Sequence, residues 1–387
     1  MIRRVTGTPR GGYEYSQLQA FAHDNGYVML IEGPSEDDAS LVIRRWPSLE
    51  VALDDGATAH WNVPRWHPVD WATIIHFDSN ADEVLRLQFT DISTGETETV
   101  FTFPPNYQGI RGNQSFDEIS RTDEWLAGLA TTGLGQVIFT FNLVTRELGA
   151  EIDFDALYAG VCTLDPQYGA IDPDWVGVSP LGRYLVVQWP TDGTGRCEGL
   201  ETFDIRSGAY VGHISSGHAH GDLAVLADGE TEVFVTTELS GPTGGESYVT
   251  GTPADGDFDS NYPGISYRAL PGLATGEQTP TYLYLTDWII EHISCRGPFG
   301  WCLATTYIDP AHGDYDPLEG ELFLFRLDGS EVVRLAQHRS SGEGYWQQPR
   351  ASFSNDGRYV IFDSDWNPKG PLGSPSAYVI DLAERAP

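Results

Sequence analysis

Basic side chains are the scarcest feature of this sequence. Lys and Arg total 22 against 56 Asp and Glu, so the net charge is −34, and the only lysine is Lys369. Nucleic-acid binding needs a cationic surface opposite the phosphates, so this balance excludes a nucleic-acid partner. Such an acidic chain is typical of salt-adapted organisms, and self-repulsion favours a monomer. An acidic ligand would need a local group of arginines.

Long apolar runs are also missing. No stretch approaches the roughly 18 apolar residues that cross a bilayer, so we predict no membrane span. The segment Met1–Arg4 lacks the apolar core of a signal peptide. The compartment stays open: periplasmic or secreted if a leader has been removed, and otherwise the cytoplasm of a salt-adapted organism.

Cysteine and the common catalytic motifs are sparse. The four cysteines, Cys162, Cys197, Cys295 and Cys302, contain no CxxC spacing, which argues against a disulfide scaffold and a cysteine zinc site but leaves one or two disulfides open. There is no GxSxG, HExxH, EF-hand or glycine-rich phosphate-loop pattern. The Asp-rich residues 254–259 carry oxygen ligands suited to calcium, but chance clusters are expected in so acidic a chain.

Turn residues and aromatics are abundant, and they recur in a pattern. The chain has 43 Gly, 24 Pro and 12% aromatic residues, which is typical of many short strands joined by turns. A turn followed by an apolar strand is clearest at Ser179–Val187 and Ser354–Phe362, with looser copies at 23–29, 67–74, 120–126 and 227–235. A further strand and turn follow several copies, as at 90–95, 203–208 and 325–329. These units predict the four-stranded blades of a β-propeller.

The repeat predicts an all-β, seven-bladed β-propeller that forms a single domain over residues 1–387; six and eight blades are the alternatives. Its inner strands are expected to begin near Gln17, Trp66, Glu118, Val176, Asp222, Ser294 and Ala351. Residues 241–264 are interpreted as a long loop, and helical periodicity is faint, at 15–24 and 120–129 only. The last blade lacks one strand, so we predict that residues 2–6 complete it and close the ring.

Residues at the starts of the inner strands would ring one mouth of the channel. Nearly all of them are ionisable or strong hydrogen bonders, as expected of a binding site. The candidate site residues are Tyr15, Arg65, Glu118, His218, His220, Asp222, His292, Gln348 and Arg350.

Local spacing suggests roles for several of these residues. In an extended chain His218 and His220 share a face with Asp222, so they suit one metal or one substrate, although a solvated loop is the alternative. The turn-forming residues 297–300 place His292 at the rim. Arg350 suits a carboxylate because its guanidinium is a planar fork, although pairing with an acid between blades is the alternative.

Three stretches carry a family resemblance: residues 217–222; residues 292–294 with Pro298 and 300–301; and residues 348–357. They resemble the seven-bladed polysaccharide lyases of the oligogalacturonate lyase and ulvan lyase types, and their TolB-like relatives. The resemblance implies β-elimination on an acidic polysaccharide or oligosaccharide. In the oligogalacturonate lyase pattern a metal lies between a His and a Gln that is followed by spaced histidines. His292 and Gln348 match the first two ligands, but Arg350 and Ser352 replace the later histidines.

This departure favours the metal-free variant, which needs no cofactor. The alternative is one divalent ion, manganese or calcium, held by His292, Gln348 and His218. Elimination requires positive charge at the uronate carboxylate, a base at the neighbouring carbon and an acid at the leaving oxygen.

The implied roles are shared among the nine candidates. Arg350, supported by Arg65, clamps the carboxylate; His220 is the base and Tyr15 the acid. The sugar is positioned by His218, His292, Gln348, Asp222 and Glu118. Two other functions stay open: a non-catalytic propeller that binds a glycan or protein, and a glycoside hydrolase whose two carboxylates are Glu118 and Asp222.

Overall fold

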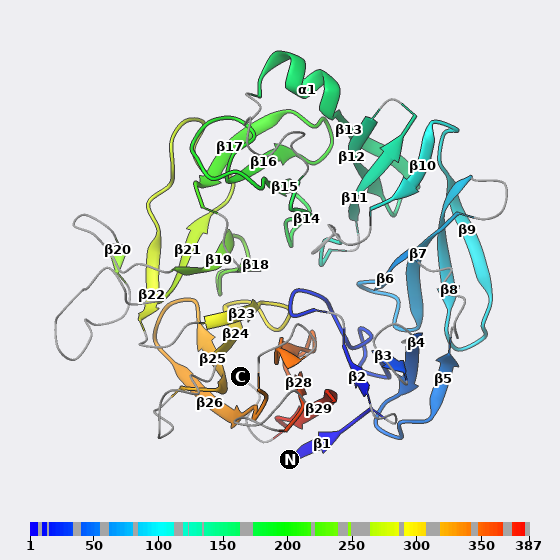
Figure 1. Ribbon diagram of the computed structural model, residues 1–387, viewed down its shortest axis with the longest axis vertical. Helices are drawn as coiled ribbons and strands as arrows, with labels where there is room; N and C mark the ends of the chain where they lie inside the picture. Colours follow the sequence, from blue (N-terminus) through cyan, green and yellow to red (C-terminus); the bar gives the residue numbers. More distant parts are fainter. Residues whose placement is uncertain are drawn as a thin grey trace.

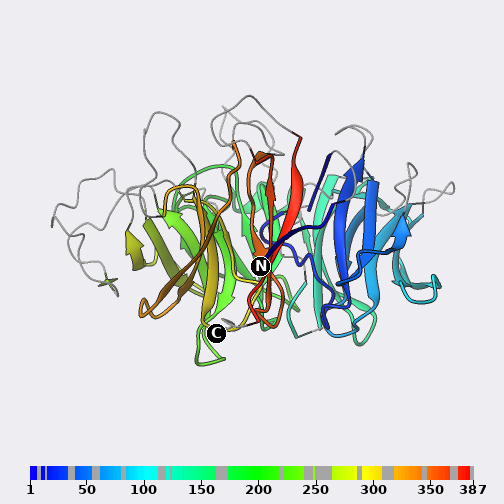
Figure 2. The same ribbon diagram turned by 90° about the horizontal axis from the view of Figure 1, so that it is seen from below.

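The computed structural model describes most of the chain. The described residues are 1–6, 10–13, 15–33, 40–54, 62–79, 84–111, 119–122, 124–133, 135–162, 173–217, 221–238, 247–248, 264–285, 290–306, 318–341, 347–366 and 374–383. Seven antiparallel sheets stand around a central channel, as Figure 1 shows down the channel and Figure 2 from the side. The predicted seven-bladed β-propeller is therefore confirmed.

Each blade is named by its order in the chain, and its strands run from the channel outwards. Blade 1 contains β2 (Arg10–Gly12), β3 (Tyr27–Gly33), β4 (Ser40–Arg45) and β5 (Val51–Asp54). Blade 2 contains β6 (Asn62–Trp66), β7 (Thr73–Ser79), β8 (Leu85–Asp91) and β9 (Thr97–Thr102). Blade 3 contains β10 (Tyr107–Ile110), β11 (Trp125–Thr132), β12 (Gly135–Asn142) and β13 (Glu147–Asp153). Blade 4 contains β14 (Trp175–Val178), β15 (Tyr184–Gln188), β16 (Leu200–Asp204) and β17 (Tyr210–Ser215).

The remaining blades complete the circle. Blade 5 contains β18 (Gly221–Val225), β19 (Glu232–Glu238), β21 (Gly264–Ala269) and β22 (Thr281–Leu285), to which β20 (Ser247–Tyr248) adds in parallel. Blade 6 contains β23 (Ile290–Ser294), β24 (Trp301–Thr306), β25 (Glu321–Arg326) and β26 (Val332–Gln337). Blade 7 contains β27 (Ser352–Phe353), β28 (Tyr359–Ser364), β29 (Ser376–Asp381) and, outermost, β1 (Ile2–Arg4).

The two chain ends close the ring in blade 7. Strand β1 pairs antiparallel with β29, with Ile2 opposite Ile380 and Arg4 opposite Tyr378. Figure 1 shows the blue first strand beside the red last one. The predicted closure by the N-terminal strand is confirmed, and it gives the last blade a partner for its edge.

Helix is nearly absent from the described residues. The short helix α1 (Phe154–Gly160) follows β13 and was not predicted. The faint helical pattern at residues 120–129 was wrong, because its second half belongs to β11. Residues 125–130 of β11 are all buried, and a short continuous apolar strand cannot be told from a buried helical segment by periodicity alone. The long loop predicted at 241–264 lies mostly outside the described residues; the described part consists of β20 and Gly264, the first residue of β21.

The core consists of seven apolar clusters, one at each junction between neighbouring blades. Between blades 2 and 3, for example, Phe77, Phe103 and Phe139 pack edge to face. Burying one such ring stabilises the fold by about 1.5–3 kcal/mol. The blades are therefore held to one another by side chains, and the channel between their inner edges is left for polar groups.

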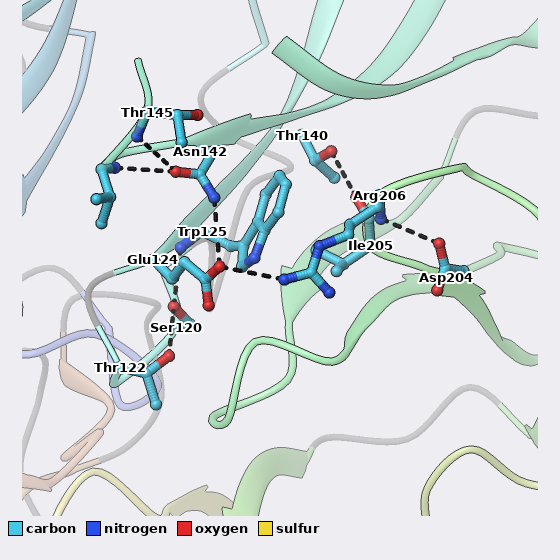
Figure 3. Close-up of polar contacts among 11 residues, drawn as sticks. Ser120, Thr122, Glu124, Trp125, Thr140, Asn142, Thr145, Asp204, Ile205 and Arg206 are labelled. Carbon is cyan, nitrogen blue, oxygen red and sulfur yellow. Dashed lines mark hydrogen bonds and ion pairs between the residues drawn. The ribbon is translucent and has the colours of Figure 1, made fainter. Parts of the chain in front are cut away.

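A recurring serine explains the repeat seen in the sequence. The Oγ atoms of Ser120, Ser179 and Ser354 each accept a hydrogen bond, 3.0 Å long, from the backbone N–H five residues later. This contact closes the turn between the first and second strands of blades 3, 4 and 7. Figure 3 shows the copy at Ser120 and, beside it, Glu124 of blade 3 at 3.2 Å from Arg206 of blade 4.

Inner-strand starts were predicted with mixed success. The starts near Val176, Asp222 and Ala351 are right to within one residue. Trp66 and Ser294 are instead the last residues of β6 and β23.

Two further starts were displaced because the inner strand is interrupted. In blade 1, β2 ends at Gly12 and the chain rejoins β3 only at the Phe21–Val28 bridge. In blade 3, β10 ends at Ile110 and the chain rejoins β11 at the Ile119–Leu126 bridge. The repeat near Gln17 and Glu118 marked the second half of each interrupted strand.

The interruption in blade 1 sends residues 15–19, called the crossing segment, into the channel (Figure 1). The Gln17 side-chain amide donates to the backbone oxygen of Gly221 in blade 5. The Leu18 carbonyl oxygen accepts a 3.1 Å hydrogen bond from Ser352 of blade 7. The crossing segment thus ties blade 1 to its neighbour, blade 7, and across the channel to blade 5.

Candidate functional site

The predicted site residues do not form one ring at one mouth. Glu118, His218 and His220 lie outside the described residues. Arg65 is the penultimate residue of β6, so it lies near the far end of its inner strand rather than at the start. The assumption of a single ring is therefore corrected, because the starts of β6 and β23 were placed four residues too late.

Tyr15 and His292 are brought together in the channel. Tyr15 belongs to the crossing segment and His292 to β23 of blade 6, and their ring centroids are 5.2 Å apart at an interplanar angle of 88°. Edge-to-face contacts of this kind fix the orientation of both rings. His292 is buried, whereas Tyr15 and Gln348 are half-buried. A phenol and an imidazole in contact are suited to proton transfer.

Arg350 is enclosed by protein. Its side chain and that of Asp363 in β28 are both 0% exposed, and Arg350 Nη2 lies 3.0 Å from Asp363 Oδ2. Burial raises the pKa of Asp363 to about 7, and the Arg350 charge opposes that rise. The geometry favours the structural interpretation of Arg350, because its guanidinium is directed to an internal carboxylate rather than to the channel.

A cavity of about 350 Å³, which we call the exit cavity, lies where the inner strands lead into their first turns. Its described lining residues come from blades 1, 2, 3, 6 and 7: Gln17, Leu18, Gln19, His23, Arg65, Trp66, His67, Pro68, Ile119, Ser120, Arg121, Arg296, Gly297, Pro298, Phe299 and Asn355. Three of these residues are arginines, and none is an aspartate or glutamate. The described wall is therefore cationic in a chain whose net charge is −34.

The three arginines approach the exit cavity from separate blades. Arg121 Nη1 crosses from blade 3 to donate a 2.6 Å hydrogen bond to the Gly297 carbonyl oxygen of blade 6. Its Nη2 is buried and has no hydrogen-bond partner among the described residues. Burial lowers the pKa of Arg121 to about 10. Burial and then the charge of Arg65 lower the pKa of Arg296 to about 9. The cluster is thus electrostatically strained in its present surroundings.

Asp222 is a buried carboxylate that interacts with Arg121 and Arg296 of this cluster. Its side chain is 0% exposed, and Oδ2 accepts a 2.5 Å hydrogen bond from the Cys295 N–H. Arg296 Nη2 is 3.8 Å from Oδ1. Burial raises the pKa of Asp222 to about 7, opposed by the Cys295 hydrogen bond and by the Arg121 charge. Asp222 is therefore a buried counter-ion, without the solvent access that a substrate contact needs.

The turn at residues 296–300 forms a rigid part of the wall. A disulfide joins Cys295 to Cys302 on either side of this turn, and a second joins Cys162 to Cys197. Gly300 has φ +81°, and a Cβ atom there would lie 2.9 Å from the Cβ of Ala227 in blade 5. The Gly300 N–H also donates to the Val225 carbonyl at 2.8 Å. Arg296 and Phe299 are thus presented by a fixed turn.

The residues present do not fit the metal site of the oligogalacturonate lyase pattern. No group of three His, Cys, Asp or Glu side chains that suits a metal occurs within the described ranges. Arg350 binds Asp363, and Ser352 donates to the Leu18 carbonyl, so the positions of the later histidines hold other contacts. The Asp-rich residues 254–259 lie outside the described part of the chain.

Sequence reasoning missed Arg121 and Arg296. Arg121 follows the turn serine Ser120, and Arg296 follows Cys295 just beyond β23. The signal that could have found them is position: each lies directly after an inner strand, where the first turn begins. Looking only at strand starts excluded that end of the channel.

Comparisons with known proteins address the fold. No protein-family model and no curated protein matches the chain. Among solved structures it is similar to an oligogalacturonate lyase from Vibrio parahaemolyticus, with a TM-score of 0.61 and 13% identity over 100% of this chain and 94% of that one. It is also similar to the tricorn protease, with a TM-score of 0.52 and 13% identity over 98% of this chain and 34% of that one.

TolB from Acinetobacter baumannii is more distant, with a TM-score of 0.39 and 15% identity over 81% of this chain and 65% of that one. No described helix is long and apolar enough to cross a membrane. At these identities the similarities show the fold alone. The chain is a seven-bladed β-propeller of the architecture found in oligogalacturonate lyase.

Proposed function

We propose that the chain is a polysaccharide lyase that binds a uronate-containing oligosaccharide in its channel and cleaves it by β-elimination. The observation that carries the proposal is the contact between Tyr15 and His292, which pairs a phenol with an imidazole from two blades. The shared architecture with an oligogalacturonate lyase is compatible with this function.

The chemistry assigns each step to a side chain. His220 takes the proton from the carbon next to the carboxylate, and that electron pair forms the new carbon–carbon double bond. The bond from the next carbon to the glycosidic oxygen breaks, and Tyr15 protonates the leaving oxygen. His292 holds the Tyr15 ring edge to face and, with Gln348 and His218, positions the sugar.

The carboxylate clamp changes from the sequence-based assignment. Arg350 is committed to Asp363, so we assign the carboxylate contact to Arg65, which lines the exit cavity. An arginine beside the carboxylate stabilises the enolate-like charge that develops during elimination.

An ultraviolet assay for the unsaturated uronate product tests the proposal. Pectic, ulvan, alginate and glycosaminoglycan substrates are each supplied in high salt, with and without chelator. Absorbance is expected to rise on one polymer, and Tyr15→Phe and His292→Ala are each expected to lower kcat about 100-fold or more. Tyr210→Phe removes a hydroxyl from β17, the outermost strand of blade 4, and should leave the rate unchanged. If folded protein gave no rise in absorbance with any of these polymers, the proposed lyase activity would be rejected.

A non-catalytic glycan-binding propeller is the second candidate, favoured by the enclosure of Arg350. The same assay separates the two, because a binding module retains affinity without product. A glycoside hydrolase is disfavoured by the burial of Asp222, one of its two required carboxylates.

A further inference from the structure

The exit cavity carries an excess of positive charge that the packing of the fold does not explain. Arg65, Arg121 and Arg296 line it, and its described wall contains no carboxylate. Burying a guanidinium is costly unless its donors find partners. Arg121 nevertheless keeps Nη2 buried and without a hydrogen-bond partner among the described residues. Buried Asp222 offsets one of the three positive charges, and a fold that only had to close its ring would be expected to supply further acids from the 56 in the chain.

Mutual repulsion within the cluster adds a second observation. Burial and then the like charge of Arg65 lower the pKa of Arg296, and both arginines line the same cavity. An anion between the guanidinium groups would offset this repulsion and supply the acceptor that Arg121 lacks in the described structure.

Contacts within the protein hold the cationic wall in position. Arg121 is held by the Gly297 carbonyl, and the turn that carries Arg296 is bounded by the Cys295–Cys302 disulfide. Gly297 is itself packed against Phe353, since a Cβ atom there would lie 2.1 Å from that ring. A wall fixed in this way loses little conformational freedom on binding, which favours affinity.

The size and chemistry of the cavity select an organic ligand over a bare ion. Its volume of about 350 Å³ is at the lower end of the range for small-molecule sites, roughly 300–1,000 Å³. Phe299 is 42% exposed and lies 5.8 Å from the Arg121 guanidinium carbon. Trp66 and Pro298 add apolar surface. The ring can contact the body of a ligand while the guanidinium groups bind its charged end.

We propose that the exit cavity is a binding site for a small organic oxyanion, such as a sugar acid or sugar phosphate, held by Arg121 and Arg296 with Arg65 beside them. This inference shares Arg65 with the proposed lyase but does not depend on elimination. Binding without product would contradict only the lyase. The cavity site alone would be contradicted if the unsaturated product formed at the same rate in the Arg121 and Arg296 variants and no oxyanion bound to the chain.

Isothermal titration calorimetry with four probes tests the site on the intact chain. D-glucuronate, D-glucose 6-phosphate and neutral D-glucose differ at one carbon, and inorganic sulfate represents the bare ion. Glucuronate or the phosphate ester is expected to bind at least ten-fold tighter than glucose, and tighter than sulfate. The tighter of the two identifies the oxyanion. Equal affinity for glucose, or for sulfate, would overturn the proposal, as would no binding of any probe.

Matched arginine variants locate the binding. Arg121→Gln and Arg296→Gln are each expected to weaken the tighter probe about ten-fold or more. Arg146→Gln removes the same charge from an exposed surface pair with Glu98 and should change affinity less than two-fold. If Arg121→Gln fails to fold by circular dichroism, Arg121→Lys keeps the charge but loses the planar fork, and its affinity should fall several-fold. Unchanged affinity in both Arg296→Gln and the folded Arg121 variant would overturn the assignment.

Discussion

Two arginine–aspartate groups in this propeller share their chemistry but differ in their surroundings. Arg350 and Asp363 form an ion pair, which we call the matched pair, 3.0 Å apart and completely buried. Arg296 lies 3.8 Å from buried Asp222, yet its side chain is 12% exposed and lines the exit cavity beside two further arginines. A buried ion pair surrounded by packed side chains indicates a structural role. Positive charge that is not neutralised and lines a cavity indicates a binding site for an anion.

Chain geometry explains the difference. Arg350 and Asp363 belong to one hairpin of blade 7, where Asp363 also donates its backbone N–H to the Pro349 carbonyl at 3.0 Å. The cavity arginines come from blades 2, 3 and 6, so only closure of the ring brings them together. Arg350 is thus paired with an acid close to it in the chain. The cavity arginines come from separate blades and together form a cationic site.

Breaking the matched pair is expected to give the largest effect. Arg350→Met leaves the buried Asp363 carboxyl without its cation and hydrogen-bond donor, so the free energy of unfolding should fall by about 3–5 kcal/mol. Urea denaturation measures it. The double variant Arg350→Met/Asp363→Leu should recover most of that loss, because both buried charges are gone. A single-variant loss below about 1 kcal/mol would show that the pair is not isolated from water.

Removing each of the two disulfides is expected to affect stability and oxyanion binding differently. Replacing Cys162 and Cys197 with Ala opens the longer loop and should cost about 4 kcal/mol, against about 2.5 kcal/mol for Cys295 and Cys302. Only the second double variant frees the turn that carries Arg296, so only it should weaken oxyanion binding, by several-fold. Calorimetry and urea denaturation of both variants check this. Equal binding in the two variants would contradict the rigid-wall account.

The same substitution made in the exit cavity should have the opposite balance. Arg296→Met is expected to lower the free energy of unfolding by only about 1 kcal/mol or less, since the Asp222 carboxylate keeps its backbone hydrogen bond and the Arg121 charge. Affinity for the oxyanion should fall about ten-fold. The comparison fails if Arg296→Met destabilises the chain as strongly as Arg350→Met.

The pH dependence of binding should be the smallest effect. Asp222 has its pKa raised to about 7, so it becomes neutral as the pH falls from 8 to 6 and the cavity becomes more positive. Oxyanion affinity should then rise roughly five-fold, the effect of one nearby charge. Calorimetry at pH 8 and pH 6 should show that the rise in oxyanion affinity is absent from Asp222→Asn. The exposed control Asp228→Asn should keep that rise.

The matched pair titrates in the same range but should not affect binding. Asp363 has a folded pKa of about 7, above its unfolded value of about 3.9, so its contribution to stability is complete below that value and is lost as the pH rises through 7. The Arg350→Met/Asp363→Leu variant should therefore keep the pH dependence of binding seen in the unmodified chain. If the affinity of this variant for the oxyanion no longer changed with pH, the matched pair and the exit cavity would be electrostatically coupled, which would contradict this prediction.

The fold was largely predictable because its signals are local. The turn serines Ser120, Ser179 and Ser354 mark the first hairpin of three blades through contacts that span five residues. Counting the predicted inner strands gave seven blades, and the missing strand of the last blade pointed to residues 2–6. Repetition makes each local signal reinforce the next.

The candidate site was only partly predictable because it depends on contacts across the ring. The crossing segment leaves blade 1 to reach Gly221 and His292, which no local pattern encodes. A four-residue error at the starts of β6 and β23 was enough to place Arg65 at the wrong end of the channel and to hide Arg296. Three further candidates, Glu118, His218 and His220, fall outside the described residues and stay predictions.

A crystal structure of the chain soaked with D-glucuronate would test the central claim most directly. The account predicts the carboxylate in the exit cavity, about 2.7–2.9 Å from guanidinium nitrogens of Arg121 and Arg296, with the sugar against Phe299. A carboxylate bound elsewhere in the channel, with the exit cavity free of ligand at a concentration that saturates binding in solution, would contradict it.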